Sequence, residues 1–151
     1  MCLVCDRIKM IQEGRNPYFV KELETGYVVI GDHQHFKGYC LFLCKIHETE
    51  LHRLPGEFKK KYLEEMSFVG EAAYRAFAPD KMNYELLGNG DVHLHWHIFP
   101  RVAGDTPVKG PVWWLPYEEM YSKENEPSAE ELEDLKRRLL KELTWVLEET
   151  K

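Results

Sequence analysis

The sequence lacks any cluster of lysine and arginine. Its 20 basic residues are outnumbered by 26 acidic ones, and the net charge is -6. A protein that binds a DNA or RNA polymer needs clustered positive charge to neutralise phosphates, so we expect no nucleic-acid polymer as a partner. Isolated basic residues such as Arg101 and Lys109 can still hold one small phosphate ligand. The net charge therefore argues against a nucleic-acid polymer as a partner, while a single nucleotide remains a possible ligand.

Long apolar runs are also missing. The longest are far too short to cross a bilayer, and the opening stretch MCLVCDRIKM has neither the apolar core nor the cleavage site of a signal peptide. We therefore expect no membrane partner and a cytoplasmic location, where thiols stay reduced. The four cysteines are accordingly interpreted as metal ligands or buried apolar residues before disulfides.

No internal repeat or low-complexity tract interrupts the chain, and its 151 residues fit one domain, 1–151. Apolar periodicity and turn signals predict helices at 5–13, 55–78 and 128–148 and strands at 18–23, 26–31, 39–45, 82–88 and 92–99. Asn89-Gly90 predicts a tight turn that joins the last two strands as an antiparallel hairpin. The pattern indicates an α+β fold with an antiparallel sheet of about five strands, a long inserted helix and a C-terminal helix.

Residues 101–127 contain two glycines and four prolines, and we expect them to form an irregular segment. Its aromatic residues Trp113, Trp114 and Tyr117 are expected to pack it against the domain. One of the two tryptophans could instead stack on a base, but buried packing is the favoured interpretation.

The most informative stretch is DVHLHWHIFPR, residues 91–101. Alternate side chains of a strand share a face, so His93, His95 and His97 should point one way. The apolar residues between them should point into the core: Val92, Leu94, Trp96 and Ile98. Three imidazoles at this spacing leave structural, metal-binding and catalytic roles open.

Catalysis is the favoured role, because a neutral imidazole attacks phosphorus readily and its adduct breaks down in water. A second imidazole or backbone N–H groups can stabilise the charge on the phosphoryl oxygens. A catalytic metal held by all three rings is disfavoured, since same-face neighbours on a strand lie about 6.6 Å apart.

The stretch His93-Leu94-His95-Trp96-His97-Ile98-Phe99 resembles the motif of the histidine-triad (HIT) family, in which histidines alternate with apolar residues. The resemblance continues through Pro100-Arg101 and upstream through His35-Phe36-Lys37-Gly38 and Lys45-Ile46-His47. It covers roughly residues 2–101. It implies the HIT fold and a nucleotide hydrolase or nucleotidyl transferase, acting on a dinucleoside polyphosphate or a nucleoside phosphoramidate. A non-catalytic nucleotide-binding or sensing protein on the same scaffold is the alternative.

The resemblance also implies roles for the three histidines. His95 would attack the α-phosphorus and form a nucleotidyl-histidine intermediate, and His97 would contact the phosphate. His93 would orient the strand or serve a metal. Water or another acceptor would then release the nucleotide. The family is often dimeric, so a homodimer is a further implication.

Four residues are candidates for binding the nucleotide. By resemblance, Asn89 is the best match to a side chain that reaches the phosphate from the preceding turn, with Asn83 behind it; Asn89 could instead only tolerate the turn geometry. Asp32 is the nearest match to an acidic residue that contacts the ribose, one residue out of register, and Arg101 is the basic candidate. Several branches of the family carry Gly-Gln-Ser or Gly-Gln-Thr before the triad, whereas this chain has the shorter Gly88-Asn89-Gly90-Asp91.

Cys2-Leu3-Val4-Cys5 is a Cys-x-x-Cys pair, which can supply two zinc ligands from a tight turn. His47 and His52 have a spacing compatible with the other two ligands. The resemblance instead implies a structural zinc held by Cys2, Cys5, His47 and His93, and we favour this set over one that uses His52. Cys40 and Cys44 share one face of a strand and are expected to be inert core residues.

Overall fold

The computed structural model describes residues 1–151 and contains one five-stranded sheet. Every neighbouring pair is antiparallel, in the spatial order β1-β2-β3-β5-β4. The strands span Phe19–Glu22 (β1), Gly26–Ile30 (β2), Cys40–Cys44 (β3), Lys81–Glu85 (β4) and His95–Arg101 (β5). The predicted α+β fold with about five antiparallel strands is therefore confirmed.

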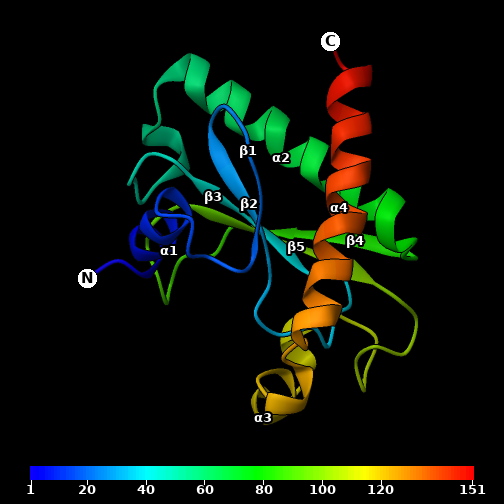
Figure 1. Ribbon diagram of the computed structural model, residues 1–151. Coiled ribbons are helices and arrows are strands. Elements are labelled where there is room, and N and C mark those ends of the chain that lie inside the picture. Colours follow the sequence, from blue (N-terminus) through cyan, green and yellow to red (C-terminus); the bar gives the residue numbers. More distant parts are fainter.

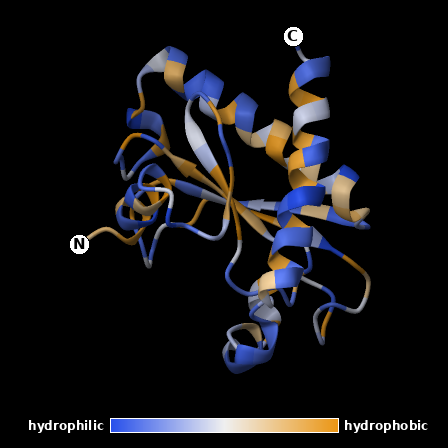
Figure 2. Ribbon diagram, viewed as in Figure 1, coloured by the Kyte–Doolittle hydropathy of each residue, from blue (hydrophilic) through white to orange (hydrophobic).

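Two long helices cover one face of the sheet (Figure 1). They are α2 (Gly56–Phe77), inserted between β3 and β4, and α4 (Ala129–Glu149) at the C-terminal end. The apolar stripe of α4 is buried as predicted, and the Oγ of Ser128 caps that helix by accepting a hydrogen bond from the Glu131 amide. Figure 2 shows hydrophobic strands at the centre of the molecule, and both hydrophobic and hydrophilic residues along α4. Burial of apolar area in this layer is the main source of stability.

Cys40 and Cys44 lie on this covered face. Both are fully buried, and burial raises the pKa of Cys40 to about 12 and that of Cys44 to about 11. Thiols with such high pKa values stay protonated, and the prediction that both are core residues is confirmed.

The opposite face of the sheet is covered at two places that leave a gap between them. Helix α1 (Leu3–Gln12) packs Val4 and Ile8 onto β2 and β3. A second cluster joins Phe36 and Phe99 to the segment that holds two short elements, a 3₁₀ turn at Val112–Trp114 and α3 (Tyr117–Met120). His95 and His97 lie on β5 between these two covers.

Several boundaries differ from the prediction. The first helix begins at Leu3 rather than at residue 5, and β5 begins at His95 rather than at residue 92. Asn89 and Gly90 do not form the tight turn, because neither has the positive φ that such a turn needs and the connection spans residues 86–94. Val92 is 52% exposed instead of facing the core.

The segment 102–127 is irregular with three short helical turns, as expected, but its aromatic residues are not buried. Only Trp113 packs on the sheet, edge-on to His97 and Phe99 with ring centres 6.4 and 6.2 Å away. Trp113, Trp114 and Tyr117 are 42%, 55% and 73% exposed. The turn directs Val112 and Leu115 inward instead, onto Phe36 and Phe99. None of the helices combines the length and the apolar character needed to cross a membrane.

Candidate active site and metal centre

His95 is the first residue of β5, and its ring is held in one orientation. Its Nδ1 lies 2.7 Å from the carbonyl oxygen of His93. A carbonyl only accepts, so Nδ1 carries the proton and donates it, which leaves a lone pair on Nε2 of the neutral ring. Because His95 lines a cleft, this lone pair is available to an electrophile there.

His97 follows on the same face of β5. The centres of the two imidazole rings are 4.8 Å apart, and the Nδ1 of His97 lies 2.7 Å from the hydroxyl oxygen of Tyr39. Burial, with a smaller effect of His95, lowers the pKa of His97 to about 4. His97 is therefore neutral at physiological pH and can act only through one N–H donor and one lone pair.

The cleft beside these rings has a volume of about 270 Å³. Its floor is apolar and comes from β2 and β3, through Val29, Leu41 and Leu43. One wall is α1 and the other is Met120 with Tyr121. A flat apolar floor beside a pair of polar rings suits a ligand with a planar base and a charged centre.

Asp32, a candidate for binding the nucleotide, also lines the cleft. The guanidinium of Arg7, from α1, donates to both of its carboxylate oxygens, at 3.2 and 2.9 Å. Asp32 and Arg7 are each about one third exposed, with side-chain accessibilities of 39% and 32%. The pair is therefore open to a ligand in the cleft.

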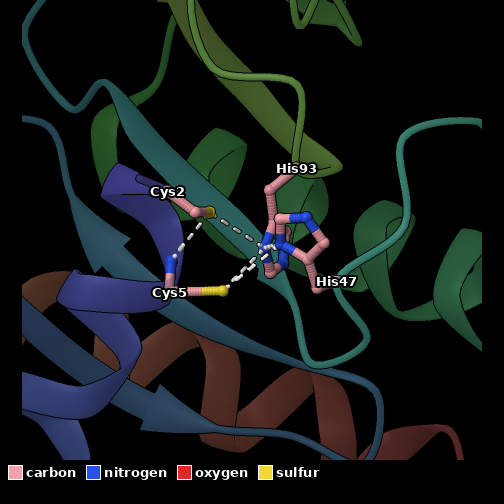
Figure 3. Close-up of side chains that lie close together, drawn as sticks. All are labelled: Cys2, Cys5, His47 and His93. Atoms are coloured by element: carbon pink, nitrogen blue, oxygen red, sulfur yellow. Dashed lines mark hydrogen bonds between the residues drawn. The ribbon is translucent and has the colours of Figure 1, made fainter.

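Four potential metal ligands meet beside the cleft (Figure 3). They come from the first turn of α1 and the capping residue before it, from the loop after β3 and from the residue two before β5: Cys2, Cys5, His47 and His93. The Nδ1 of His93 lies 3.5 Å from each sulfur, and the Nδ1 of His47 lies 3.3 Å from Cys5 Sγ and 3.1 Å from His93 Nδ1. Zinc bonds of ordinary length require ligand separations of roughly 3.3–3.8 Å in a tetrahedron. The donor set suits a tetrahedral zinc ion, these four separations lie close to that range, and all four ligand atoms lie within 4.8 Å of one another.

The surroundings of His93 complete this arrangement. Its Nε2 lies 2.7 Å from the carbonyl oxygen of Cys44, which fixes the proton on Nε2 and directs the lone pair of Nδ1 toward the sulfurs. The alternative with His52 differs, since His52 is exposed on the 3₁₀ turn Leu51–Arg53 and is not part of the cluster. Because His93 joins the cysteines while His95 and His97 line the cleft, the three motif histidines do not converge on one point.

Asp91 connects the cluster to the helix. Its carboxylate accepts hydrogen bonds from the amides of Val4 and His93, at 3.0 and 3.2 Å. Burial alone would raise the pKa of Asp91, but these bonds outweigh burial and lower it. The carboxylate is therefore charged at neutral pH and lies at the N-terminus of α1, where a negative charge is favourable.

The other predicted nucleotide-binding residues lie elsewhere. Asn83 and Arg101 line a separate cavity of about 1090 Å³, at β4 and the loop after β5. There Arg101 donates to Asn83 Oδ1 at 2.8 Å and to both oxygens of Asp105 at 2.8 Å. Asn89 is exposed in the 86–94 connection and does not line the histidine cleft. Their contacts with a nucleotide stay predictions.

Sequence reasoning missed three residues of this site: Arg7, Tyr39 and Asp91. Tyr39 and His97 are 58 positions apart, and Arg7 and Asp32 are 25 apart, so no local pattern relates them. Asp91 carried a local signal, since the side chain of an Asp commonly accepts the hydrogen bond of the amide two residues later.

Comparison with known proteins agrees with the motif. The model of the HIT domain matches residues 18–104. A histidine triad protein from Marinobacter aquaeolei VT8 is 25% identical, with a TM-score of 0.72 over 85% of this chain and 89% of that chain. A Zn-bound histidine triad family protein from Mycobacterium smegmatis is 21% identical, with a TM-score of 0.63 over 99% and 97% of the two chains.

A hypothetical histidine triad nucleotide-binding protein from Sulfolobus tokodaii strain 7 is 19% identical, with a TM-score of 0.70 over 93% of this chain and 92% of that chain. No curated protein matches significantly. These structures share the fold, and the domain match covers more than half of the chain, including the triad and β1 to β5. The chain therefore belongs to the HIT family.

Proposed function

We propose that the protein binds a nucleotide in the cleft and cleaves its phosphate linkage through a nucleotidyl-His95 intermediate. One observation carries the proposal: the carbonyl of His93 accepts the Nδ1 proton of His95, so that Nε2 keeps its lone pair on the cleft side of β5. The substrate is a dinucleoside polyphosphate or a nucleoside phosphoramidate, and transfer to an acceptor other than water is the variant reaction.

The reaction has two steps, and in each step one bond to phosphorus forms while another breaks. His95 Nε2 attacks the α-phosphorus while the bond from phosphorus to the leaving oxygen or nitrogen breaks. The leaving group takes that electron pair and, where the leaving atom is an amine nitrogen, a proton from solvent. The ring then carries a positive charge, which the hydrogen bond from Nδ1 to the His93 carbonyl stabilises. Water next attacks phosphorus, loses a proton, and returns the electron pair of the P–N bond to Nε2. The products are a nucleoside monophosphate and neutral His95.

His97 stabilises the phosphoryl oxygens in both steps. A neutral imidazole beside His95 can donate one hydrogen bond where negative charge develops, without repelling the cationic intermediate. A protonated His97 would oppose the charge that forms on His95. The low pKa of His97 is thus consistent with its assigned role.

The base and ribose occupy the rest of the cleft. The apolar floor of Val29, Leu41 and Leu43 accommodates the base. Asp32 accepts hydrogen bonds from the ribose hydroxyls, because a carboxylate has about four lone-pair sites and Arg7 uses only two of them. Asn83, Asn89 and Arg101 remain candidates for contacts with parts of the substrate that extend beyond the cleft.

A structural zinc ion is part of the proposal. Cys2, Cys5, His47 and His93 would supply all four ligands, so the ion would tie α1 to the start of β5 and would have no open position for water. Its contribution would be to stabilise the fold. The alternative is a protein that binds or senses a nucleotide without catalysis. It would use the same cleft, but it would not require a free lone pair on His95.

The test is the His95→Ala variant against the parent, with His52→Ala as the matched control. We expect His95→Ala to abolish turnover of dinucleoside polyphosphates and phosphoramidates while keeping the melting temperature and nucleotide affinity of the parent. His52→Ala, at an exposed imidazole outside the cleft, should turn over normally. Mass spectrometry of the parent during turnover should find a nucleotidyl group on His95. Equal turnover by parent and His95→Ala would refute the mechanism, and nucleotide binding without any turnover would favour the sensing function.

A further inference from the structure

Tyr39 is placed beside the triad by several contacts that hold it rigidly. It lies directly before β3, and its carbonyl accepts hydrogen bonds from the Gly31 amide and the Gln34 side chain, both at 2.9 Å. Its ring stacks on Phe99, with ring centres 4.2 Å apart and planes within 8° of parallel. The position of the phenol is therefore fixed by its backbone and by its ring.

Gly31 provides the space for this ring. A Cβ atom at position 31 would lie 2.2 Å from the Tyr39 ring, a distance that no real side chain tolerates. The ring is thus enclosed between Gly31 and Phe99. From this position its hydroxyl makes one hydrogen bond, with the Nδ1 of His97 at 2.7 Å.

The direction of that bond follows from proton counting. Burial raises the pKa of Tyr39 well above its ordinary value, so the phenol keeps its proton, and the lowered pKa of His97 keeps the ring neutral with one N–H. If Nδ1 carried the imidazole proton, the phenolic hydrogen would have no acceptor in the protein, because the half-buried Tyr39 hydroxyl contacts no other hydrogen-bonding group. If the phenol donates to Nδ1, both groups are satisfied and the imidazole proton resides on Nε2.

We infer that Tyr39 is a positioning residue that fixes His97 in the Nε2–H tautomer. His95 and His97 then present opposite functions: His95 offers a lone pair on Nε2, set by the His93 carbonyl, and His97 offers an N–H donor on Nε2, set by the Tyr39 hydroxyl. The contribution of this arrangement to turnover rests on the proposed function, whereas the tautomer itself does not. Neither the HIT motif nor its spacing specifies this tyrosine.

The tautomer is measured by two-bond ¹H–¹⁵N NMR of the histidine rings at pH 7, compared for the parent and Tyr39→Phe. In the parent we expect a protonated Nε2 and a hydrogen-bonded, unprotonated Nδ1 for His97. In Tyr39→Phe, which keeps the stacked ring, the Nδ1 resonance should move toward that of an imidazole nitrogen without a donor. The matched control is Tyr62→Phe, because Tyr62 is a buried, stacked tyrosine on the other face of the sheet whose hydroxyl donates to the Phe42 carbonyl.

Kinetics provide the second measurement. Tyr39→Phe should lower kcat about tenfold, the effect of losing one buried hydrogen bond, with KM changed less than about twofold. Tyr62→Phe should leave the NMR spectrum of His97 and kcat unchanged. A protonated Nδ1 in the parent, or an unchanged Nδ1 resonance in Tyr39→Phe, would overturn the inference. If no substrate is turned over by the parent, the proposed function fails, but the NMR comparison still decides the tautomer.

Discussion

The buried neutral ring of His97 should make the stability of the protein depend on pH. Burial lowers its pKa from 6.5 to about 4. Between these two values the unfolded chain binds a proton that the folded chain does not, so the free energy of unfolding falls as pH falls. A shift of this size corresponds to about 3 kcal/mol, lost between about pH 6.5 and pH 4. The full contribution is present above pH 6.5, and the loss is complete below pH 4.

The variant His97→Phe removes this titration while keeping a flat ring between Tyr39 and the rest of the site. The substitution leaves the Tyr39 hydroxyl without its partner, which lowers the free energy of unfolding. Because this loss is the same at every pH, it does not affect how the free energy of unfolding changes with pH. Urea denaturation at several pH values between 4 and 8 should give a curve for His97→Phe that is flatter than that of the parent by about 3 kcal/mol in total. The control His52→Phe, at an exposed ring, should follow the parent. Parallel curves for His97→Phe and the parent would show that His97 is not held neutral by burial.

Two further changes test the packing of Tyr39 and the metal site. Gly31→Ala should lower the free energy of unfolding by about 1–3 kcal/mol in urea denaturation, because its Cβ would overlap the Tyr39 ring, whereas Gly90→Ala, with open space around it, should have no such effect. Equal losses in these two variants would contradict the close approach at Gly31. The parent should contain about one zinc ion per chain by elemental analysis, and the ion should be lost in Cys5→Ser but kept in Cys40→Ala, since Cys40 is buried far from the cluster in the core. A metal-free parent would refute the zinc proposal.

The elements that sequence predicted well are those whose signal is local and periodic. The stripe of α4 and the alternation of Leu94, Trp96 and Ile98 with histidines report burial on one side of one element. The pairing of β4 with β5 was predicted because Asn89-Gly90 indicated an antiparallel hairpin, whereas the pairing of β3 with β5 has no local signal. The fold class and the shared face of His95 and His97 could therefore be predicted from the sequence.

The connection between β4 and β5 could not be predicted in the same way. Asn89-Gly90 is a strong local turn signal, but long-range contacts extend the loop instead. The Asp91 carboxylate accepts the Val4 amide of α1, and the Leu94 amide donates to the Glu48 carbonyl. These contacts draw residues 91–94 away from β4, so the strand begins only at His95.

Tyr39 and Arg7 were missed for a related physical reason. Each acts through a partner that only the folded chain brings near, and neither residue type is rare enough at its position to stand out. For Arg101, a contact with the nucleotide phosphate stays a prediction. Its charge next to the motif suggested a phosphate ligand, yet its donors are occupied by Asp105 and Asn83 in a different cavity.

His93 makes two different contacts, one through its ring and one through its backbone carbonyl. Its ring belongs to the cysteine cluster, while its carbonyl accepts the proton of His95 Nδ1. Both are compatible only because residue 93 lies outside β5: within the strand its ring would lie on the same face as His95, toward the cleft. A change that displaces the 91–94 segment should therefore disturb the tautomer of His95 without touching any residue of the cleft floor. The cluster of cysteines and histidines and the proposed nucleophile His95 are in this sense coupled through one peptide group.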